Sequence, residues 1–567
     1  MMGAHTAAQR LWLTHHAERV HGLQGRLATQ RMLERLWAQD ASLWSQDPAA
    51  QRAIRDRLGW LTIIPAMRPR LPEFGRALEE LRSAGVRRVL LLGMGGSALF
   101  AAVCRGLFGV AAPGIDLAVL DTTDPAAIRA AHRTTPPEQL GLLIASKSGT
   151  TLEVQALAAY FLHALRVPGQ EIGRRLVVIT DAGTPLEAQA RTWGARHVVA
   201  HGPGGGIDVG GRYAALTAFG LLPAALIGVD LEQLVSRAAA MLDRCAPGVP
   251  LEENPAAQLA CVLAGLRQAG QDKLTLLSSP ALAEVGAWME QMVAESLGKR
   301  GQGIVPVCGE PVREATAYGR DRVFVELQVA ERWDEELDRR ARALSAAQHP
   351  VLRIHWQDRY DLGGEVVKWS VATALAGCLL EVDPFDEPNV QEAKDQTRSL
   401  LERAVPGQPL NEPEPPAGTD GDVTLYGPPG TPASVAAALR AFIEALRPGD
   451  YLGLLSFLPR TEAIDAAARA LRDRLAATLQ QATILQHGPR YLHSTGQLFK
   501  GGPPTGAFLV LTADEADDLA IPGAPHTFGA LKRAQALGDV QAMRRHGLRV
   551  LRLHLRDPLA GLRQLAP

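Results

Sequence analysis

Short apolar segments alternate with segments of helical length along much of the chain. The first apolar segments lie at residues 89–92, 117–120, 142–145, 176–180 and 197–199. Each has the length of a buried strand, and a helix-length stretch separates it from the next. Strands that alternate with helices predict a parallel sheet covered by helices on both faces.

The same alternation is repeated in two later parts of the chain. A second group of expected strands lies at 274–277, 304–307, 323–328 and 351–355, with helices at 284–297, 334–347 and 364–380. A third group of expected strands lies at 451–457, 483–486, 508–512 and 550–555. The pattern therefore predicts an α/β protein with three sheet-forming parts.

The remaining segments suggest the boundaries between these parts. Residues up to about 82 show Leu and Trp at helical spacing, and residues 405–422 are rich in Pro, Gly and acidic side chains, which is typical of a linker. We therefore expect the following organisation: a helical segment at 1–82, α/β domains at 83–250 and 251–404, a linker at 405–422, and a C-terminal α/β region at 423–567.

Composition and charge exclude several classes of protein. Hydrophobic residues make up 47% of the 567 positions, and 59 Lys and Arg against 60 Asp and Glu leave a formal net charge of -1. This balance lacks the basic excess of a nucleic-acid-binding protein. The five cysteines are scattered without paired short spacing, which argues against a disulfide framework or a zinc site and favours buried thiols in a reducing compartment.

No targeting or membrane segment is evident. Residues 1–26 lack the continuous apolar core of a signal peptide. The most apolar stretch, 214–229, is interrupted by Pro223 and is shorter than the roughly 18 apolar residues that a membrane span needs. We expect a cytoplasmic protein that binds neither membrane nor nucleic acid.

A glycine-rich turn follows the first expected strand. Leu-Leu-Gly-Met-Gly-Gly-Ser at 91–97 places Gly96 and Ser97 before a helix, where free backbone N–H groups can hold an anion. The spacing differs from the G-x-G-x-x-G of a dinucleotide site. Taken alone, the turn fits a structural role as well as a phosphate site.

A second loop carries more polar groups than a helix start requires. Ile-Ala-Ser-Lys-Ser-Gly-Thr-Thr-Leu-Glu at 144–153 crowds four hydroxyl groups around one glycine, whereas a single hydroxyl would cap the helix. This surplus favours a phosphate cradle. The candidate ligands are Ser146, Lys147, Ser148, Thr150 and Thr151. Glu153 occupies the position of a capping-box carboxylate, and we expect it to be structural.

Three further motifs, together with these loops, resemble the phosphoglucose isomerase family. Val-Gly-Gly-Arg-Tyr at 209–213 is similar to its V-G-G-R-[YF]-S segment, and Gln-Met-Val-Ala-Glu-Ser-Leu-Gly-Lys at 291–299 is similar to Q-x-x-x-E-S-x-G-K. Asp-Pro-Phe-Asp-Glu-Pro-Asn-Val-Gln-Glu-Ala-Lys at 383–394 is similar to N-P-F-D-Q-x-x-V-E-x-x-K, with Asp383 and Glu387 replacing the family's Asn and Gln. The order of the motifs is that of the family.

The C-terminal part resembles the isomerase half of bacterial transaldolase/phosphoglucose isomerase fusions. The similar segments are 491–502, Tyr-Leu-His-Ser-Thr-Gly-Gln-Leu-Phe-Lys-Gly-Gly, and 528–539, Phe-Gly-Ala-Leu-Lys-Arg-Ala-Gln-Ala-Leu-Gly-Asp. Only helical residues precede the first expected strand, so we expect no transaldolase activity. The resemblance implies two flavodoxin-like sugar isomerase (SIS) domains and a C-terminal α/β segment.

The resemblance also implies roles for individual residues. Glu295 matches the family's general base, which would move a proton between C2 and C1 of an open-chain sugar. Gln291 lies one turn earlier on the same helical face. Arg212 would stabilise the enediolate by its fixed charge, and Lys394 matches the lysine that assists at the ring oxygen. A solvated surface lysine is the alternative for Lys394.

The ring-opening residue is assigned from the C-terminal part of the chain. The family's T-N-G-Q-H segment is absent between Glu295 and Lys394, and the nearest similar segment begins at His493. Phe499 stands where the fusion relatives commonly carry a histidine, so His493 is the remaining histidine in the motif. A histidine bonded to backbone is the alternative. In the family this histidine crosses a dimer interface, which is consistent with a homodimer here.

These assignments predict an aldose–ketose isomerase that interconverts glucose 6-phosphate and fructose 6-phosphate through a cis-enediol, without metal or other cofactor. A dual phosphoglucose/phosphomannose isomerase differs only in C2 stereochemistry and remains open. A sugar-phosphate-sensing regulator is the alternative from another class. Such regulators usually add a basic helix-turn-helix segment, and the sequence shows none.

Overall fold

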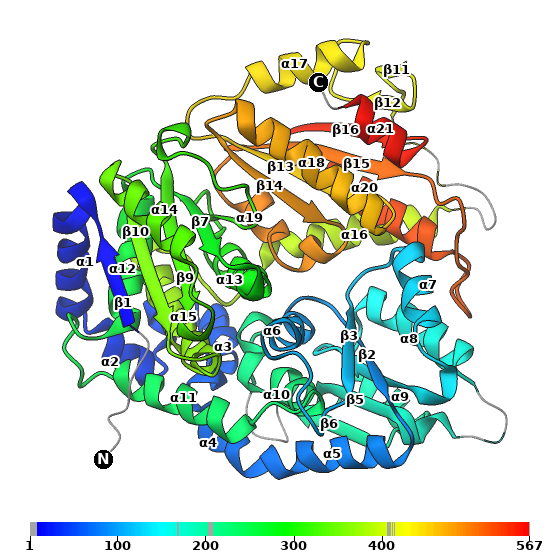
Figure 1. Cartoon of the computed structure of the whole chain (residues 1–567), viewed down its shortest axis with the longest axis horizontal. Helices are drawn as coiled ribbons and strands as arrows, with labels where there is room; N and C mark the ends of the chain where they lie inside the picture. The colour runs from blue at the N-terminus through cyan, green and yellow to red at the C-terminus, as the bar shows by residue number, and fades with distance from the viewer. Residues whose placement is uncertain are drawn as a thin grey trace.

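The computed structural model describes residues 8–166, 169, 171–201, 208–404, 410, 412 and 414–565. Residues 1–7 of the expected helical segment and residues 405–409, 411 and 413 of the expected linker lie outside the described residues. The described residues form three sheets that lie around helix α13, Ala283–Leu297 (Figure 1). This arrangement confirms the expected α/β class.

The first sheet contains five parallel strands in the order β3-β2-β4-β5-β6. The strands are β2 (Arg88–Gly93), β3 (Asp116–Leu120), β4 (Leu140–Ala145), β5 (Leu176–Asp181) and β6 (His197–His201). The helices are α6 (Leu99–Phe108), α7 (Pro125–Arg133), α8 (Leu152–Ala164), α9 (Pro185–Thr192), α10 (Ala218–Leu226) and α11 (Leu231–Arg244). Every residue of β4 is buried, as its uninterrupted apolar sequence predicts for a sheet covered on both faces.

The second sheet has the order β1-β10-β9-β7-β8. Its strands are β1 (Ala8–Trp12), β7 (Lys273–Ser278), β8 (Val305–Val307), β9 (Arg322–Val329) and β10 (Val351–Trp356). The accompanying helices are α12 (Pro255–Gln268), α13, α14 (Glu335–Ala346), α15 (Asp361–Leu380) and α16 (Pro388–Glu402). All residues of α15 are buried, so this helix forms part of the central core.

The N-terminal segment is not entirely helical, which corrects the expectation from the sequence. Strand β1 pairs antiparallel with β10, placing Leu11 opposite Leu352. It is a five-residue edge strand, and its Leu11 and Trp12 also fit the helical spacing of the following segment. The expected helices do follow: α1 (Ala17–Thr29), α2 (Met32–Trp37), α3 (Pro48–Asp56), α4 (Ile63–Met67) and α5 (Leu71–Ser83).

The third sheet has the order β11-β12-β16-β15-β13-β14, in which β13 to β16 are parallel. Its strands are β11 (Gly418–Asp420), β12 (Val423–Tyr426), β13 (Tyr451–Phe457), β14 (Ala482–His487), β15 (Gly506–Ala513) and β16 (Arg549–Leu555). The helices are α17 (Val435–Glu444), α18 (Glu462–Thr478), α19 (Gly496–Gly501), α20 (Phe528–Arg545) and α21 (Pro558–Gln564).

The expected linker is partly built into this third sheet. Its last residues form β11, which pairs antiparallel with β12. Glu412 binds Arg533 and Arg552, and Glu414 binds Arg544. The polar composition does exclude a core, but backbone pairing and ion pairs hold the segment without one.

A buried ion pair joins the third-sheet region to the first sheet, and a buried hydrogen bond joins it to the second. Lys532 Nζ of α20 lies 2.7 Å from Asp124 Oδ2, at the carboxyl edge of the first sheet. Glu310 binds Arg322 of the second sheet at 2.8 Å and accepts a hydrogen bond of 2.9 Å from Thr483 N of β14. All five residues are buried, so these contacts hold the C-terminal region against the two SIS-type sheets.

No helix in the described part of the chain is long and apolar enough to cross a membrane. Among the described residues, no group of three or more His, Cys, Asp or Glu side chains is placed to hold a metal ion. All five cysteines are free thiols; Cys308 is half-buried and the other four are buried.

Candidate active site

A pocket of about 270 Å³ lies where the carboxyl edges of the first and third sheets meet α16. Four segments line it: the start of α8, one face of α16, the 3₁₀ turn Arg490–His493 after β14, and α20. The lining residues are Ser148, Thr150, Thr151, Leu152, Glu153, Val390, Gln391, Ala393, Lys394, Thr397, Arg398, Leu492, His493 and Gln535. The pocket therefore combines hydroxyl groups, cations and one carboxylate.

The hydroxyl groups come from the loop that precedes α8. Ser148, Thr150 and Thr151 line the pocket, and Thr151 is the residue before the first turn of the helix. Ser146 lies behind them, with its Oγ 3.1 Å from Thr151 Oγ1. The hydroxyls and the free N–H groups of this helix start form the kind of cradle that binds a phosphate group.

Lys147 is not brought to the pocket. Its Nζ binds the carboxylate of Asp181 and lies 2.6 Å from Asp208 Oδ1. Burial alone would lower the pKa of the ammonium group, but these two carboxylates raise it overall. Lys147 therefore fixes the base of the loop to the ends of β5 and the segment before Arg212. This position differs from the phosphate contact expected from the sequence.

Glu153 and His493 form a hydrogen-bonded pair inside the pocket. His493 Nε2 lies 2.9 Å from Glu153 Oε1, which also accepts a hydrogen bond of 2.7 Å from Gln535 Nε2. Burial alone would raise the pKa of Glu153, but His493 lowers it overall, so the carboxylate is ionised. An ionised carboxylate can only accept, so Nε2 is the donor and Nδ1 is left for proton exchange.

This pair corrects the expectation for Glu153. No side chain caps α8, and Glu153 reaches across to the third sheet instead of bonding back to its own loop. Gln535 is held in turn by Thr123, whose Oγ1 donates to Gln535 Oε1 at 2.9 Å. The His493 side chain therefore binds a carboxylate, whereas the alternative from the sequence was a histidine bonded only to backbone.

A second polar cluster adjoins this pocket on the far side of His493. Gln291 Nε2 donates to the main-chain oxygen of His493 at 2.9 Å and to Glu295 Oε2 at 3.0 Å. Glu295 Oε1 lies 3.0 Å from Arg212 Nη1. Gln291 and Glu295 share one face of α13, as their spacing predicts. A single row of contacts thus joins His493 to Arg212.

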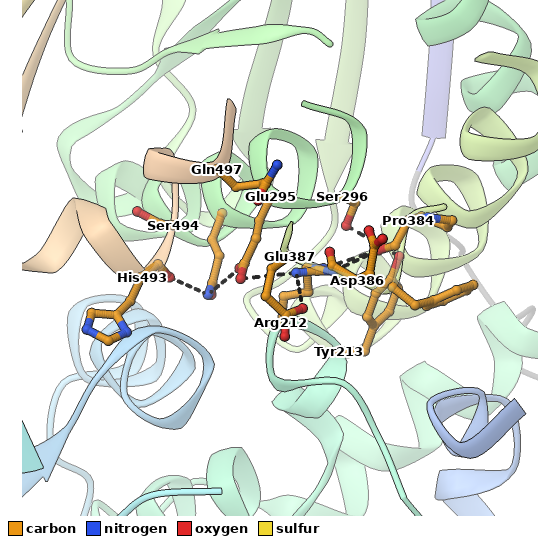
Figure 2. Close-up of polar contacts among 12 residues, drawn as sticks. Arg212, Tyr213, Glu295, Ser296, Pro384, Asp386, Glu387, His493, Ser494 and Gln497 are labelled. Atoms are coloured by element: carbon orange, nitrogen blue, oxygen red, sulfur yellow. Dashed lines mark hydrogen bonds and ion pairs between the residues drawn. The ribbon is translucent and has the colours of Figure 1, made fainter. Parts of the chain in front are cut away.

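Three motifs that lie far apart in the sequence meet at Arg212. Its Nε and Nη2 donate to Pro384 O at 3.2 and 3.0 Å, and Nη2 also donates to Asp386 O at 2.7 Å. Lys299 Nζ lies 2.7 Å from Asp386 Oδ1. The Asp-Pro-Phe-Asp turn therefore presents main-chain oxygens that fix the cation next to the glutamate (Figure 2).

Burial sets the proton affinity of the groups in this cluster. It raises the pKa of Glu295, although Arg212 opposes the shift, and it lowers the pKa of Lys299 to about 8. A carboxylate whose pKa is raised toward neutrality is suited to act as a general base. The cluster thus places a basic carboxylate beside a fixed cation.

The first glycine turn packs against these segments and does not line the pocket. A Cβ atom at Gly96 would lie 2.0 Å from the main-chain oxygen of Gly211, so only glycine lets this turn approach the residue before Arg212. Ser97 is half-buried and is not among the lining residues. The structure thus gives Gly96 a packing role, and phosphate contact by Gly96 and Ser97 stays a prediction.

The structure brings most of the expected residues into two adjoining groups. His493, Lys394 and the three hydroxyls line the pocket, and Glu295, Gln291 and Arg212 form the buried cluster. Sequence reasoning missed Glu153, Gln535, Lys299 and Glu387 as members of the site. All four lie within the quoted motifs, but a motif does not reveal which side chains meet in space.

A match to known proteins supports the arrangement of these motifs. The family model "Phosphoglucose isomerase" matches residues 79–304. The "Probable glucose-6-phosphate isomerase" of Haloarcula marismortui is 29% identical over 353 residues, 56% of this chain and 79% of that protein. The "Glucose-6-phosphate isomerase" of Thermus thermophilus is 29% identical over 391 residues, 61% and 90% of the two chains.

Solved structures extend the comparison to the fold. A "hypothetical protein" of Thermus thermophilus has a TM-score of 0.58 and 26% identity, and the match covers 69% of this chain and 99% of that protein. A "glucose-6-phosphate isomerase" of Chlamydia trachomatis shares the fold, with a TM-score of 0.56 and 17% identity over 68% of this chain and 86% of that protein. From its motifs, its fold and these relatives, the chain belongs to the phosphoglucose isomerase family.

Proposed function

We propose that the protein is a glucose-6-phosphate isomerase, which interconverts glucose 6-phosphate and fructose 6-phosphate through a cis-enediol. The observation that carries this proposal is the position of Glu295. It is a buried carboxylate with a raised pKa, held between Gln291 and Arg212 beside a pocket with hydroxyl groups at a helix start. The named activity of the Haloarcula and Thermus relatives supports the same reaction.

The substrate's phosphate group binds at the start of α8. Ser148, Thr150 and Thr151 supply hydroxyl donors there, and the helix N-terminus favours an anion. Lys394 of α16 lines the same pocket. Because the net charge of the chain is only -1, these local groups, and not a general positive field, attract the dianion.

Ring opening requires a proton to leave the C1 hydroxyl and another to reach the ring oxygen. His493 takes the first proton at Nδ1, since Nε2 donates to Glu153. Lys394 donates toward the ring oxygen from the facing helix. The ionised Glu153 stabilises the imidazolium that forms, as a carboxylate does when it orients a catalytic histidine.

Glu295 then transfers the proton between C2 and C1 of the open-chain sugar. Arg212 lies 3.0 Å from this carboxylate and stabilises the negative charge of the enediolate. The unpaired oxygen of Gln291, which is buried without a hydrogen-bond partner, is free to accept from a sugar hydroxyl. The reaction needs no change in oxidation state outside the sugar, so the side chains suffice for it.

The cellular setting follows from the proposed reaction. We propose that the protein acts in the cytoplasm on a small-molecule sugar phosphate, binds neither nucleic acid nor a resident cofactor, and assembles as a homodimer. Its place is in glycolysis and gluconeogenesis, which use this interconversion.

The test is isomerisation by the purified chain, followed by a coupled dehydrogenase assay. We expect turnover of fructose 6-phosphate, and a loss of roughly 100-fold to 10,000-fold in Glu295→Gln, because the amide keeps the shape but cannot accept the proton. Glu290→Gln is the matched control, since Glu290 is a buried glutamate of the same helix that binds Gln486 instead.

Absence of turnover in the wild-type chain would refute the proposal. Parallel reactions with mannose 6-phosphate decide whether the substrate range includes the C2 epimer.

A further inference from the structure

Glu387 stands where the family's motif has glutamine, and it lies beside the proposed general base. It is the residue before the first turn of α16. Arg57 Nη1 lies 3.2 Å from Glu387 Oε2, and Arg212 Nη1 lies 3.5 Å from the same oxygen. The carboxylate therefore sits between two guanidinium groups.

Arg212 is shared between two carboxylates. Its Nε and Nη2 are occupied by the main-chain oxygens of Pro384 and Asp386, which leaves Nη1 for side chains. Nη1 lies 3.0 Å from Glu295 Oε1 and 3.5 Å from Glu387 Oε2. Because both oxygens contact the same nitrogen atom, the two carboxylates lie close together. Two negative charges at this separation raise each other's affinity for a proton.

We propose that Glu387 is a positioning residue for the isomerisation: its carboxylate shares the Arg212 guanidinium with Glu295 and makes Glu295 a stronger proton acceptor. This inference rests on the proposed function. Glutamine at this position would keep the hydrogen bond to Arg212 but would leave the full cationic charge facing Glu295, which weakens a carboxylate as a base.

The other charged groups around the pair do not cancel this effect. Burial and Glu387 raise the pKa of Glu295, whereas Arg212 and Lys299 lower it. Burial alone would raise the pKa of Glu387, but Arg212, Arg57, Lys299 and Lys394 lower it overall, so Glu387 remains charged. Among the described residues, the titratable groups around the pair include Arg57, Arg212, Tyr213, Lys299, Asp383, Asp386 and Lys394.

The test is the pH dependence of kcat/KM in Glu387→Gln. Its acid limb reports the pKa of the free enzyme's base, and we expect that limb to move to lower pH by on the order of one unit. At alkaline pH, turnover is expected to fall, because a weaker base abstracts the proton more slowly. Wild type and variant are assayed with the same substrate at each pH, so titration of the substrate's phosphate affects both profiles equally.

Glu392→Gln is the matched control. Glu392 lies on the same helix but binds His546 at 2.8 Å, so its loss removes one charge without touching Arg212. We expect the control to keep the wild-type profile. Glu387→Ala is the second variant: a charge effect gives the same direction of shift as Glu387→Gln, whereas a purely structural role lowers activity at all pH values alike.

The possible results separate this inference from the proposed function. An active wild type whose acid limb is unchanged in Glu387→Gln and Glu387→Ala would overturn the role of Glu387 and leave the isomerase activity intact. A shift of equal size in Glu392→Gln would also overturn it, because the effect would then be one of net charge. A wild type without isomerase activity would refute both.

Discussion

Replacement of Glu153 by glutamine should slow ring opening more than proton transfer. In the structure Glu153 Oε1 accepts from His493 at 2.9 Å and from Gln535 at 2.7 Å. The amide oxygen of glutamine can accept both hydrogen bonds, so the shape of the pocket is retained. The change removes only the negative charge that faces the imidazole.

The size of the effect follows from that one interaction. A hydrogen bond to a charged partner contributes about 1.5–3 kcal/mol, against about 0.5–1.5 kcal/mol for a neutral pair. The difference of roughly 1–2 kcal/mol, at about 1.4 kcal/mol for each factor of ten, predicts a loss of about fivefold to thirtyfold in kcat/KM on the cyclic sugar.

The assay compares the cyclic substrate with an open-chain analogue that needs no ring opening. Glu153→Gln is expected to slow the cyclic substrate and to leave the open-chain analogue within about twofold, because Glu295 is untouched. In a His493→Ala background the same change should add little, since the two residues act as a pair. Equal losses on both substrates, or full additivity with His493→Ala, would refute the assignment.

Two further predictions concern phosphate binding and pH. The double variant Ser148→Ala/Thr151→Ala should bind the 6-phosphosugar, and inorganic phosphate as an inhibitor, more weakly by roughly 1–3 kcal/mol. Thr461→Ala, at the N-terminus of α18, is the control. If KM and phosphate inhibition are unchanged in the double variant, the phosphate site lies elsewhere. Burial raises the pKa of Glu290 from 4.5 to about 7, so the folded chain holds a proton there that the unfolded chain has lost, and wild-type stability falls between these pH values. The free energy of unfolding, measured with urea, should therefore be higher in Glu290→Gln than in wild type at pH 8. This advantage of the variant should exceed that at pH 4 by roughly 3 kcal/mol, and equal differences at both pH values would contradict the reasoning.

Much of the fold could be predicted from the sequence because the core strands are uninterrupted apolar segments. Strands such as β4 and β13 are buried on every residue, and their hydrophobic sequence gives their position within a few residues. The short strands β1, β11 and β12 were not predicted. β1 and β11 lie at sheet edges, where main-chain pairing with one neighbour determines the structure. β12 lies between β11 and β16 and is largely buried, but its apolar pattern covers only four residues directly after the polar linker.

The candidate site was predicted less completely, for a related reason. Motif spacing indicated the helix face of Gln291 and Glu295, which depends only on local geometry. The pair of Glu153 and His493 joins residues 340 positions apart, and no local pattern reports such a contact. Lys147 shows a second limit of motif reasoning: its motif suggested a phosphate ligand, which stays a prediction, and gave no sign of the two carboxylates from distant segments that bind its ammonium group.

The most direct test of the central role of Glu295 is exchange of the C2 hydrogen of glucose 6-phosphate with solvent, followed by NMR in D₂O. The wild-type chain should exchange this hydrogen as it isomerises the sugar, because Glu295 carries the abstracted proton and can release it to water. Glu295→Gln should exchange it at least about 100-fold more slowly while still binding inorganic phosphate. Exchange in Glu295→Gln at more than about a tenth of the wild-type rate would contradict the assignment of Glu295 as the base.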